Sequence, residues 1–327
     1  MKMQNSALCK DEPLLQFIEV SKWYGPVLAL NQITWTLKSG IVGLVGANGA
    51  GKSTFLRLAA GLLRPTLGEV KIAGYDAWNW RSRRMIGYCP STDAFFHDLS
   101  GQQFVYVMAR LCGMARQEAR KSTEATLRRL GLSDLAARPV YGYSKGMRQR
   151  IKLAQALVHH PPLLILDEPL AGVDPLGRHE LIDLFRQLNQ EGHSLVISSH
   201  ELETLEQLTD QILILSQGRV AAFGTVAEIR CQLAEHPITI RLTVSSPRDL
   251  ARHLADWPEV SAIEWPIPSQ HASQSTLLIR VHRPREFFQR LTQFLAQNIS
   301  WDISRIEPID ESAHALLGYI LGGSGKT

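Results

Sequence analysis

The sequence GANGAGKS at residues 46–53 constrains the fold more than any other segment. It fits the pattern G-x-x-x-x-G-K-S/T and lies between an apolar run at residues 41–45 and a helix-like segment at residues 54–63. A strand, a glycine-rich loop and a helix in this order are what a phosphate-binding loop requires. The glycines let backbone N–H groups converge on phosphate oxygens, and the helix N-terminus adds partial positive charge. In such a loop Lys52 reaches the β- and γ-phosphates, and the hydroxyl of Ser53 binds Mg²⁺.

Two adjacent carboxylates provide a second signal. Asp167 and Glu168 follow the apolar run LLIL at residues 163–166. Carboxylates at the end of a buried strand are costly unless a cation or a catalytic role compensates. We expect Asp167 to hold Mg²⁺ through water and Glu168 to orient or deprotonate an attacking water. The structural alternative is an acidic cap for the following helix, and the phosphate-binding loop in the same chain makes it the weaker one.

The composition excludes several other classes of protein. The chain has 327 residues, 45% of them hydrophobic and 20% charged, which excludes a disordered or collagen-like polymer. No uncharged apolar stretch reaches the ~18 residues of a membrane span, and we expect no signal peptide. The net charge of +4 comes without a block of like charges, so no nucleic-acid partner is expected. The four cysteines have neither metal-ligand nor redox spacing, which favours reduced thiols in a cytosolic or peripheral protein.

The order of apolar segments predicts an α/β domain with a mainly parallel sheet in the first two thirds of the chain. The runs that read as strands lie at residues 14–20, 30–37, 41–45, 163–166 and 194–198. From Pro90 to Tyr143 the segments read as helices, one beginning at Ser100 and another covering residues 117–130.

The pattern changes near residue 236, where the order becomes strand, helix, strand, strand, helix, strand, helix. The expected strands lie at residues 238–244, 260–265, 277–281 and 301–306, and the clearest helices at residues 247–254 and 287–295. This order contains the βαββαβ ferredoxin-like motif. We therefore expect a nucleotide-binding domain over residues 14–235, with a helical subdomain at about residues 90–150, and a small accessory α+β domain over residues 236–327.

A third motif allows comparison with a known family. The segment YSKGMRQR at residues 143–150 resembles the signature motif of ATP-binding-cassette (ABC) ATPases, in the variant form common in bacterial exporter subunits. The order of the phosphate loop, the signature, the acidic pair and His200 in the segment SSHE also agrees with that family. The resemblance covers about residues 14–235. It implies an α/β P-loop NTPase fold, with a mixed sheet and a helical subdomain, that hydrolyses ATP with Mg²⁺.

The resemblance also implies roles for individual residues. The phosphate-contacting residues would be consecutive: Gly46, Ala47, Asn48, Gly49, Ala50, Gly51, Lys52, Ser53 and Thr54. Tyr24 would stack on adenine, with packing inside the first sheet as its alternative. His200 would contact the γ-phosphate and steady the water beside Glu168, and Asp174 would link the two nucleotide sites of a dimer. Ser144 and Gly146 would contact ATP held by the opposite subunit.

On this resemblance the chain is the ATPase subunit of an ABC-2-like exporter with a C-terminal accessory domain. Two copies would form a homodimer at the cytoplasmic face of the membrane and dock on a separate transmembrane permease. The alternative is a soluble ABC ATPase that acts on ribosomes or DNA. Such relatives usually carry two cassettes, long coiled coils or zinc-binding insertions, and this sequence shows one cassette, no sustained heptads and no zinc spacing.

One position departs from the family pattern. Ser91 stands where the family has a glutamine or glutamate that reaches Mg²⁺ and the attacking water. The serine side chain is shorter, so either a water fills the gap or Asp93 supplies the oxygen, and we favour the water. The adjacent Phe95 and Phe96 are candidates for the contact with the permease, and packing inside the helical subdomain is an equal alternative.

Overall fold

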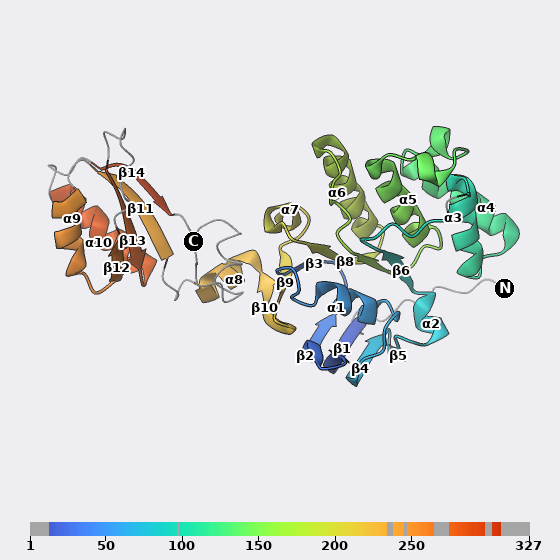
Figure 1. The fold of residues 1–327 in the computed structure, drawn as a ribbon, viewed down its shortest axis with the longest axis horizontal. Coiled ribbons are helices and arrows are strands. Elements are labelled where there is room, and N and C mark those ends of the chain that lie inside the picture. The colour runs from blue at the N-terminus through green and yellow to red at the C-terminus, as the bar shows by residue number, and fades with distance from the viewer. Residues whose placement is uncertain are drawn as a thin grey trace. The chain divides into compact units, whose positions relative to one another are not determined.

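The computed structural model describes residues 13–96, 98–233, 238–244, 247–264, 275–297 and 303–308 (Figure 1). The chain divides into two compact units, Met1–Gly224 and Thr225–Thr327. This division falls before helix α8 (Val226–Leu233), whereas the sequence analysis places the boundary after it. Two predicted strands reach beyond the described residues, one at its last residue, Trp265, and one at its first, Trp301. The last predicted helix also lies outside the described residues.

The first unit contains an antiparallel sheet with the strand order β2-β1-β4-β5. Its strands are β1 (Leu15–Tyr24), β2 (Val27–Leu37), β4 (Leu67–Ile72) and β5 (Tyr75–Asp76). The runs predicted as strands at residues 14–20 and 30–37 lie in β1 and β2, and both strands extend to the turn that joins them. Two register shifts interrupt β1 between Phe17 and Lys22, so the alternation of buried and exposed side chains is irregular there.

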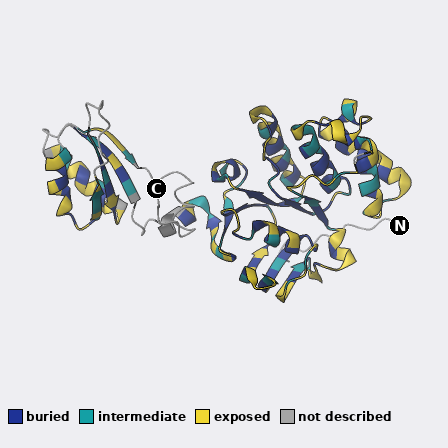
Figure 2. Ribbon diagram, in the orientation of Figure 1, coloured by how far each residue is buried: buried dark blue, intermediate teal, exposed yellow. Residues whose placement is uncertain are grey.

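A second sheet of six strands has the order β10-β9-β3-β8-β7-β6. Its strands are β3 (Ile41–Val45), β6 (Ile86–Cys89), β7 (Leu163–Leu166), β8 (Ser194–Ser199), β9 (Gln211–Ser216) and β10 (Arg219–Thr225). The pairs from β9 through β3, β8 and β7 to β6 are parallel. The strands β3, β7 and β8 are buried along their whole length, as Figure 2 shows in dark blue, which explains their continuous apolar sequences.

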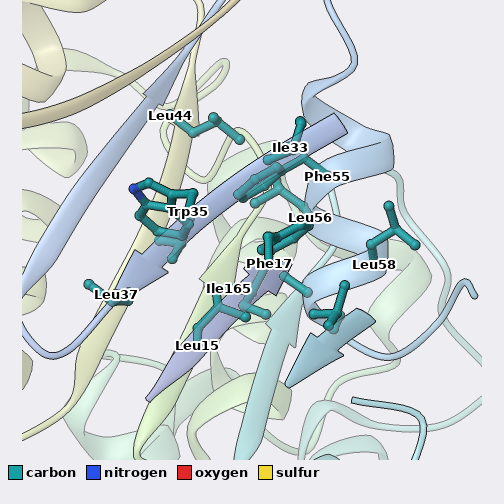
Figure 3. Packing of buried hydrophobic residues seen from close by; sticks show 14 of the residues in the cluster. Leu15, Phe17, Ile33, Trp35, Leu37, Leu44, Phe55, Leu56, Leu58 and Ile165 are labelled. Carbon is teal, nitrogen blue, oxygen red and sulfur yellow. The ribbon is translucent and has the colours of Figure 1, made fainter. Parts of the chain in front are cut away.

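Apolar side chains of both sheets meet around helix α1 (Lys52–Ala59) in one core cluster (Figure 3). The rings of Phe17 from β1 and Phe55 from α1 stack with centroids 4.2 Å apart, and Trp35 from β2 packs against both. This core fixes α1 against the two sheets and therefore fixes the loop that leads from β3 into α1.

The segment between the strands β6 and β7 is helical, as predicted, and other helices follow later in the unit. The helices of the first unit after α1 are α2 (Trp80–Arg83), α3 (Gly101–Leu111), α4 (Arg116–Arg129), α5 (Lys145–Leu157), α6 (Pro175–Gln190) and α7 (Leu202–Glu206). The predicted helix start at Ser100 is confirmed, because its side chain and Gln103 form a capping box. In the described part of the chain, no helix combines the length and the apolar character needed to cross a bilayer.

The second unit has its own antiparallel sheet, with the order β12-β13-β11-β14. After α8, its elements are β11 (Ile238–Val244), α9 (Pro247–Ala255), β12 (Val260–Glu264), β13 (Ser275–Val281), α10 (Pro284–Gln297) and β14 (Ile303–Pro308). They follow one another in the predicted order βαββαβ. A separate core that includes Leu242, Leu254, Ile279 and Phe287 joins the helices to the sheet.

Candidate functional site

The glycine-rich loop leaves the carboxyl end of β3 and leads directly into α1. Gly51 has φ 104°, and a Cβ there would lie 2.8 Å from the carbonyl oxygen of Ala29, so only glycine fits. At Gly46 a Cβ would lie 2.5 Å from the carbonyl oxygen of Leu215. Both glycines of the motif are therefore required by the close approach of neighbouring backbone.

The ammonium group of Lys52 lies within this loop. Its Nζ donates to the carbonyl oxygens of Gly46 at 2.6 Å and Ala47 at 3.3 Å. Burial lowers the pKa of Lys52, while the negative charges of Glu168 and Asp167 act in the opposite direction. The structure thus brings the loop and the acidic pair, which are far apart in the sequence, to the same edge of the sheet.

The hydroxyl of Ser198 at the end of β8 holds both acidic residues. It donates to Oδ1 of Asp167 at 2.8 Å and accepts from the backbone N–H of Glu168 at 2.8 Å. Glu168 itself has φ 52°, a left-handed conformation that costs a non-glycine residue roughly 1–3 kcal/mol. Such strain is typical of functional positions, and here it turns Glu168 away from the regular strand path.

The side chain of Glu168 meets the predicted histidine. Nδ1 of His200 lies 2.9 Å from Oε2 of Glu168, and Nε2 of the same ring lies 3.7 Å from Glu201. The ring of His200 is exposed, whereas Glu168 is largely covered. A water beside this pair can therefore give its proton to the Glu168 carboxylate, while the exposed imidazole can contact the group that the water attacks.

Asp167 has the surroundings of a metal ligand. It is 2% exposed, both of its oxygens accept hydrogen bonds from serine hydroxyls, and it makes no ion pair among the described residues. A buried carboxylate without a direct cation is unfavourable, and a bound cation would compensate its charge. Oxygen ligands from a carboxylate and the hydroxyl of Ser53 are those that Mg²⁺ prefers, so the residues present fit this ion.

The segment after β6 connects this carboxylate to α5. The hydroxyl of Ser91 donates to Oδ2 of Asp167 at 3.1 Å, and Nζ of Lys152 donates to the carbonyl oxygen of Ser91 at 3.1 Å. Asp93 pairs with Nζ of Lys152 at 3.2 Å and with Nε of Arg148 at 2.9 Å. Each oxygen of Asp93 thus has a cationic partner from α5, and these two ion pairs hold its carboxylate against that helix.

Two further predicted site residues, Ser144 and Asp174, each cap the N-terminus of a helix. Ser144 is the N-cap of α5 and accepts from the N–H of Met147, and Asp174 is the N-cap of α6 and accepts from the N–H of Gly177. The bond from Gly177 lowers the pKa of the Asp174 carboxyl. At Gly146 a Cβ would meet nothing within 4 Å, so the first turn of α5 is open to an approaching group.

The three aromatic residues predicted to make contacts, Tyr24, Phe95 and Phe96, differ in how far they are buried. The ring of Tyr24 is exposed rather than packed inside the sheet, and Nζ of Lys22 lies 5.6 Å from its centroid. Phe95 and Phe96 both contact the buried ring of Phe104, with centroids 5.5 and 6.3 Å away. Packing in the helical segment therefore holds for Phe95, while Phe96 contacts this core and still exposes more than half of its surface.

Sequence reasoning missed Ser198, Lys152 and Arg148 as members of the site. A serine in an apolar strand two residues before His200 was one available signal. A lysine on the apolar side of an amphipathic helix was another, because a buried cation requires a partner.

Comparisons with known proteins agree with this geometry. The profile of the ABC transporter family matches residues 30–171. The chain is 37% identical over 244 residues to the ABC transporter ATP-binding protein YxlF of Bacillus subtilis, over 72% of this chain and 80% of that protein. It is 30% identical over 304 residues to the daunorubicin/doxorubicin resistance ATP-binding protein DrrA of Streptomyces peucetius, over 91% and 90% of the two chains. Among solved structures, the dimeric bacterial ABC transporter cassette MJ0796 has a TM-score of 0.61 and 25% identity, over 65% of this chain and 98% of its own.

Proposed function

The chain belongs to the ABC transporter ATPases and is an ATP hydrolase, and from this premise we propose that it powers export through a separate permease subunit. The hydrolytic part of this function rests on the meeting of Lys52, Asp167, Glu168 and His200 at the carboxyl ends of β3, β7 and β8. Ligand sites of open α/β sheets lie at this edge. The drug-resistance name of the relative DrrA supports the exporter role.

The residues of the site have separate roles in ATP binding and hydrolysis. The loop N–H groups and Lys52 bind the phosphate chain, and Tyr24, which is exposed at the end of β1, stacks on adenine. Glu168 accepts the proton of the attacking water, and His200, held 2.9 Å away, contacts the γ-phosphate. When bound, Mg²⁺ neutralises charge on the phosphate oxygens, and Ser53 and Asp167 are the residues that would hold it.

The signature residues act on a second copy of the chain. Ser144 and Gly146 lie at the open first turn of α5, where N–H groups and partial positive charge favour an anion. We assign their ligand as ATP bound to the opposite subunit, so that two chains enclose two nucleotides, with Asp174 between the sites. The dimeric cassette among the related structures supports this arrangement.

We propose a location for the permease contact on the first unit. A groove of about 490 Å³ is lined by α2, β6 and the C-terminal ends of α3 and α5, including Trp80, Tyr88, Met108, Leu111 and His159. Leu111 is 72% and Trp80 61% exposed, so the groove presents two large apolar side chains to solvent, and exposed apolar surface of this kind favours a protein contact. We place the cytoplasmic segment of the permease in this groove, at the cytoplasmic face of the membrane.

Glu168→Gln tests the hydrolytic part of the proposal. The amide keeps the size of the side chain but cannot accept a proton, so ATP binding persists while turnover falls by about 10²–10⁴-fold. Gel filtration with ATP and Mg²⁺ is expected to show a dimer, and Glu203→Gln, an exposed carboxylate on α7, is the matched control. A monomer that hydrolyses ATP normally would refute the assignment.

Leu111→Glu tests the permease contact separately. It is expected to abolish co-purification with the permease and to leave ATPase activity without the permease unchanged. Leu67→Glu, on the exposed part of β4, is the control. Co-sedimentation of the wild-type chain with ribosomes or DNA, without binding to membranes, would instead establish the soluble alternative.

A further inference from the structure

A cluster of arginines and aromatic rings covers the surface around α2 in the first unit. The guanidinium groups of Arg64 and Arg83 lie 4.9 and 4.5 Å from the ring centroid of Trp78. The guanidinium group of Arg81 lies 5.5 Å from the ring of Tyr75 and 5.6 Å from that of Trp80. The arginine–tryptophan patch, as we call it, consists of Arg64, Tyr75, Trp78, Trp80, Arg81 and Arg83.

The three aromatic side chains of this patch are exposed to solvent, whereas large aromatic side chains are usually buried against other residues. Trp80 is 61% exposed, and Tyr75 and Trp78 each expose about two fifths of their surface. Arg64 and Trp78 also line a surface hollow of about 450 Å³ beside β4. Trp80 and Arg83 lie on the wall of the groove assigned to the permease, so the patch borders that groove.

The positive charge of the patch is not compensated within the described part of the chain. Arg64, Arg81 and Arg83 make no ion pair there, and Arg83 donates only to the carbonyl oxygen of Gly61. Residues 57–84 contain six basic side chains and two acidic ones. Of the two carboxylates, Glu69 pairs with Lys71 at 2.8 Å and Asp76 accepts from the N–H of Trp78 at 2.7 Å.

This combination matches the chemistry of a membrane surface. Tryptophan and tyrosine rings prefer the headgroup level of a bilayer because one part of the ring is apolar and another is polar. Arginines are attracted to anionic lipid headgroups, and contact with ring faces holds their guanidinium planes in place. The patch spans only α2, the short strand β5 and the loops that hold Arg64 and Trp78, whereas binding along a nucleic-acid backbone needs a longer basic groove.

We propose that the arginine–tryptophan patch binds the headgroups of an anionic bilayer. The contact places the rim of the groove against the membrane, beside the permease segment that the groove receives. It concerns lipid alone and does not depend on the permease or on hydrolysis.

Vesicle flotation with the purified full chain tests this inference. Binding is expected to phosphatidylcholine vesicles that contain phosphatidylglycerol, and not to vesicles of phosphatidylcholine alone. Each arginine near an anionic surface strengthens binding about fivefold, so R64Q/R81Q/R83Q is expected to weaken it on the order of 100-fold. The matched control R116Q/R120Q/R128Q removes the same charge from α4. Its affinity for the anionic vesicles is expected to fall far less than that of R64Q/R81Q/R83Q.

Tryptophan fluorescence gives a second readout that reports insertion rather than charge. Brominated phosphatidylcholine in the anionic vesicles is expected to quench part of the emission of the wild type, and this part disappears in W78F/W80F. Equal loss of binding in both arginine variants, or equal binding to both vesicle types, would overturn the proposal. Because the vesicles hold no protein, these outcomes are independent of those for the permease and for Glu168→Gln.

Discussion

The contact between Lys152 and Asp93 makes a quantitative prediction about the stability of the first unit. Lys152 is 4% exposed, and Asp93 is its only carboxylate partner within 4.0 Å among the described residues. Asp93→Asn keeps the shape of the side chain and removes its charge. Loss of one member of a buried ion pair costs about 3–5 kcal/mol, because the other charge remains buried without a partner.

The exposure of Asp93 reduces this cost. Its side chain is 43% exposed, and pairs open to solvent contribute only about 0–1 kcal/mol. The pair lies between the two limits, so we expect Asp93→Asn to lower the free energy of unfolding by about 1–2 kcal/mol. Lys152→Met removes the buried charge itself and keeps the packing of the stem. D93N/K152M is therefore expected to be no less stable than Asp93→Asn alone.

Calorimetry on the four proteins tests the reasoning. For a domain of this size, 1 kcal/mol corresponds to a shift of about 2–4 °C in Tm. The two changes are expected to be non-additive by about 1 kcal/mol, since both remove the pair between Lys152 and Asp93, while the pair between Asp93 and Arg148 is lost only in Asp93→Asn. If the losses of the single variants simply add, or if Asp93→Asn melts with the wild type, Lys152 does not depend on Asp93 and the argument from burial is wrong.

Three further predictions concern separate features of the chain. Ser91→Gln, which restores the longer side chain, is expected to raise permease-stimulated hydrolysis more than basal hydrolysis; an equal decrease in both would show that the loop has adapted to serine. A chain that ends at Glu235 is expected to bind ATP in a calorimetric titration, because the second unit has its own core; insolubility of this fragment would place the domain boundary elsewhere. Burial raises the pKa of the Cys89 thiol to about 12, so at pH 8 only about one molecule in 10⁴ carries the thiolate. Iodoacetamide is therefore expected to label Cys89 only after unfolding, and mass spectrometry of the folded protein would contradict this by finding the modified residue.

The parts of the fold that were predicted correctly are those with strong local signals. The strands β3, β7 and β8 appear in the sequence as short apolar runs, because both faces of each strand are buried. The helix α3 has a capping box at Ser100, which is a local hydrogen-bond pattern that four residues encode. These features need no information from distant parts of the chain.

The sequence did not predict that the first unit contains an antiparallel sheet separate from the parallel one, because the signals for this sheet are not local. Strand β5 has only two residues, both exposed, and the alternation in β4 covers only its second half, where Val70 and Ile72 are buried. The place of β4 beside β1 is set by pairing across the sheet, for example between Leu15 and Ile72, and β5 pairs in turn with β4. Pairing of this kind depends on which segments meet, and local sequence patterns do not record it.

The site shows the same division. The residues found from motifs, such as Lys52 and Glu168, belong to short segments whose chemistry is fixed by spacing alone. The residues that position them come from elsewhere: Ser198 is 31 residues from Asp167, and Ser91 is 76 residues from it. Neither contact follows from a motif, although each places a hydroxyl on the carboxylate that would hold Mg²⁺.

The parallel register is what converts these separate segments into one site. Leu166 of β7 pairs with Ile197 of β8, so the next residues along the two strands, Asp167 and Ser198, emerge side by side at the sheet edge. A slip of one residue would shift β8 by about 3.3 Å and turn Ser198 to the other face. The backbone N–H of Glu168 would then lose its acceptor, and the left-handed conformation of this residue would lose the bond that holds it. The apolar sequences that bury β7 and β8 therefore also determine where the carboxylate of Glu168 points.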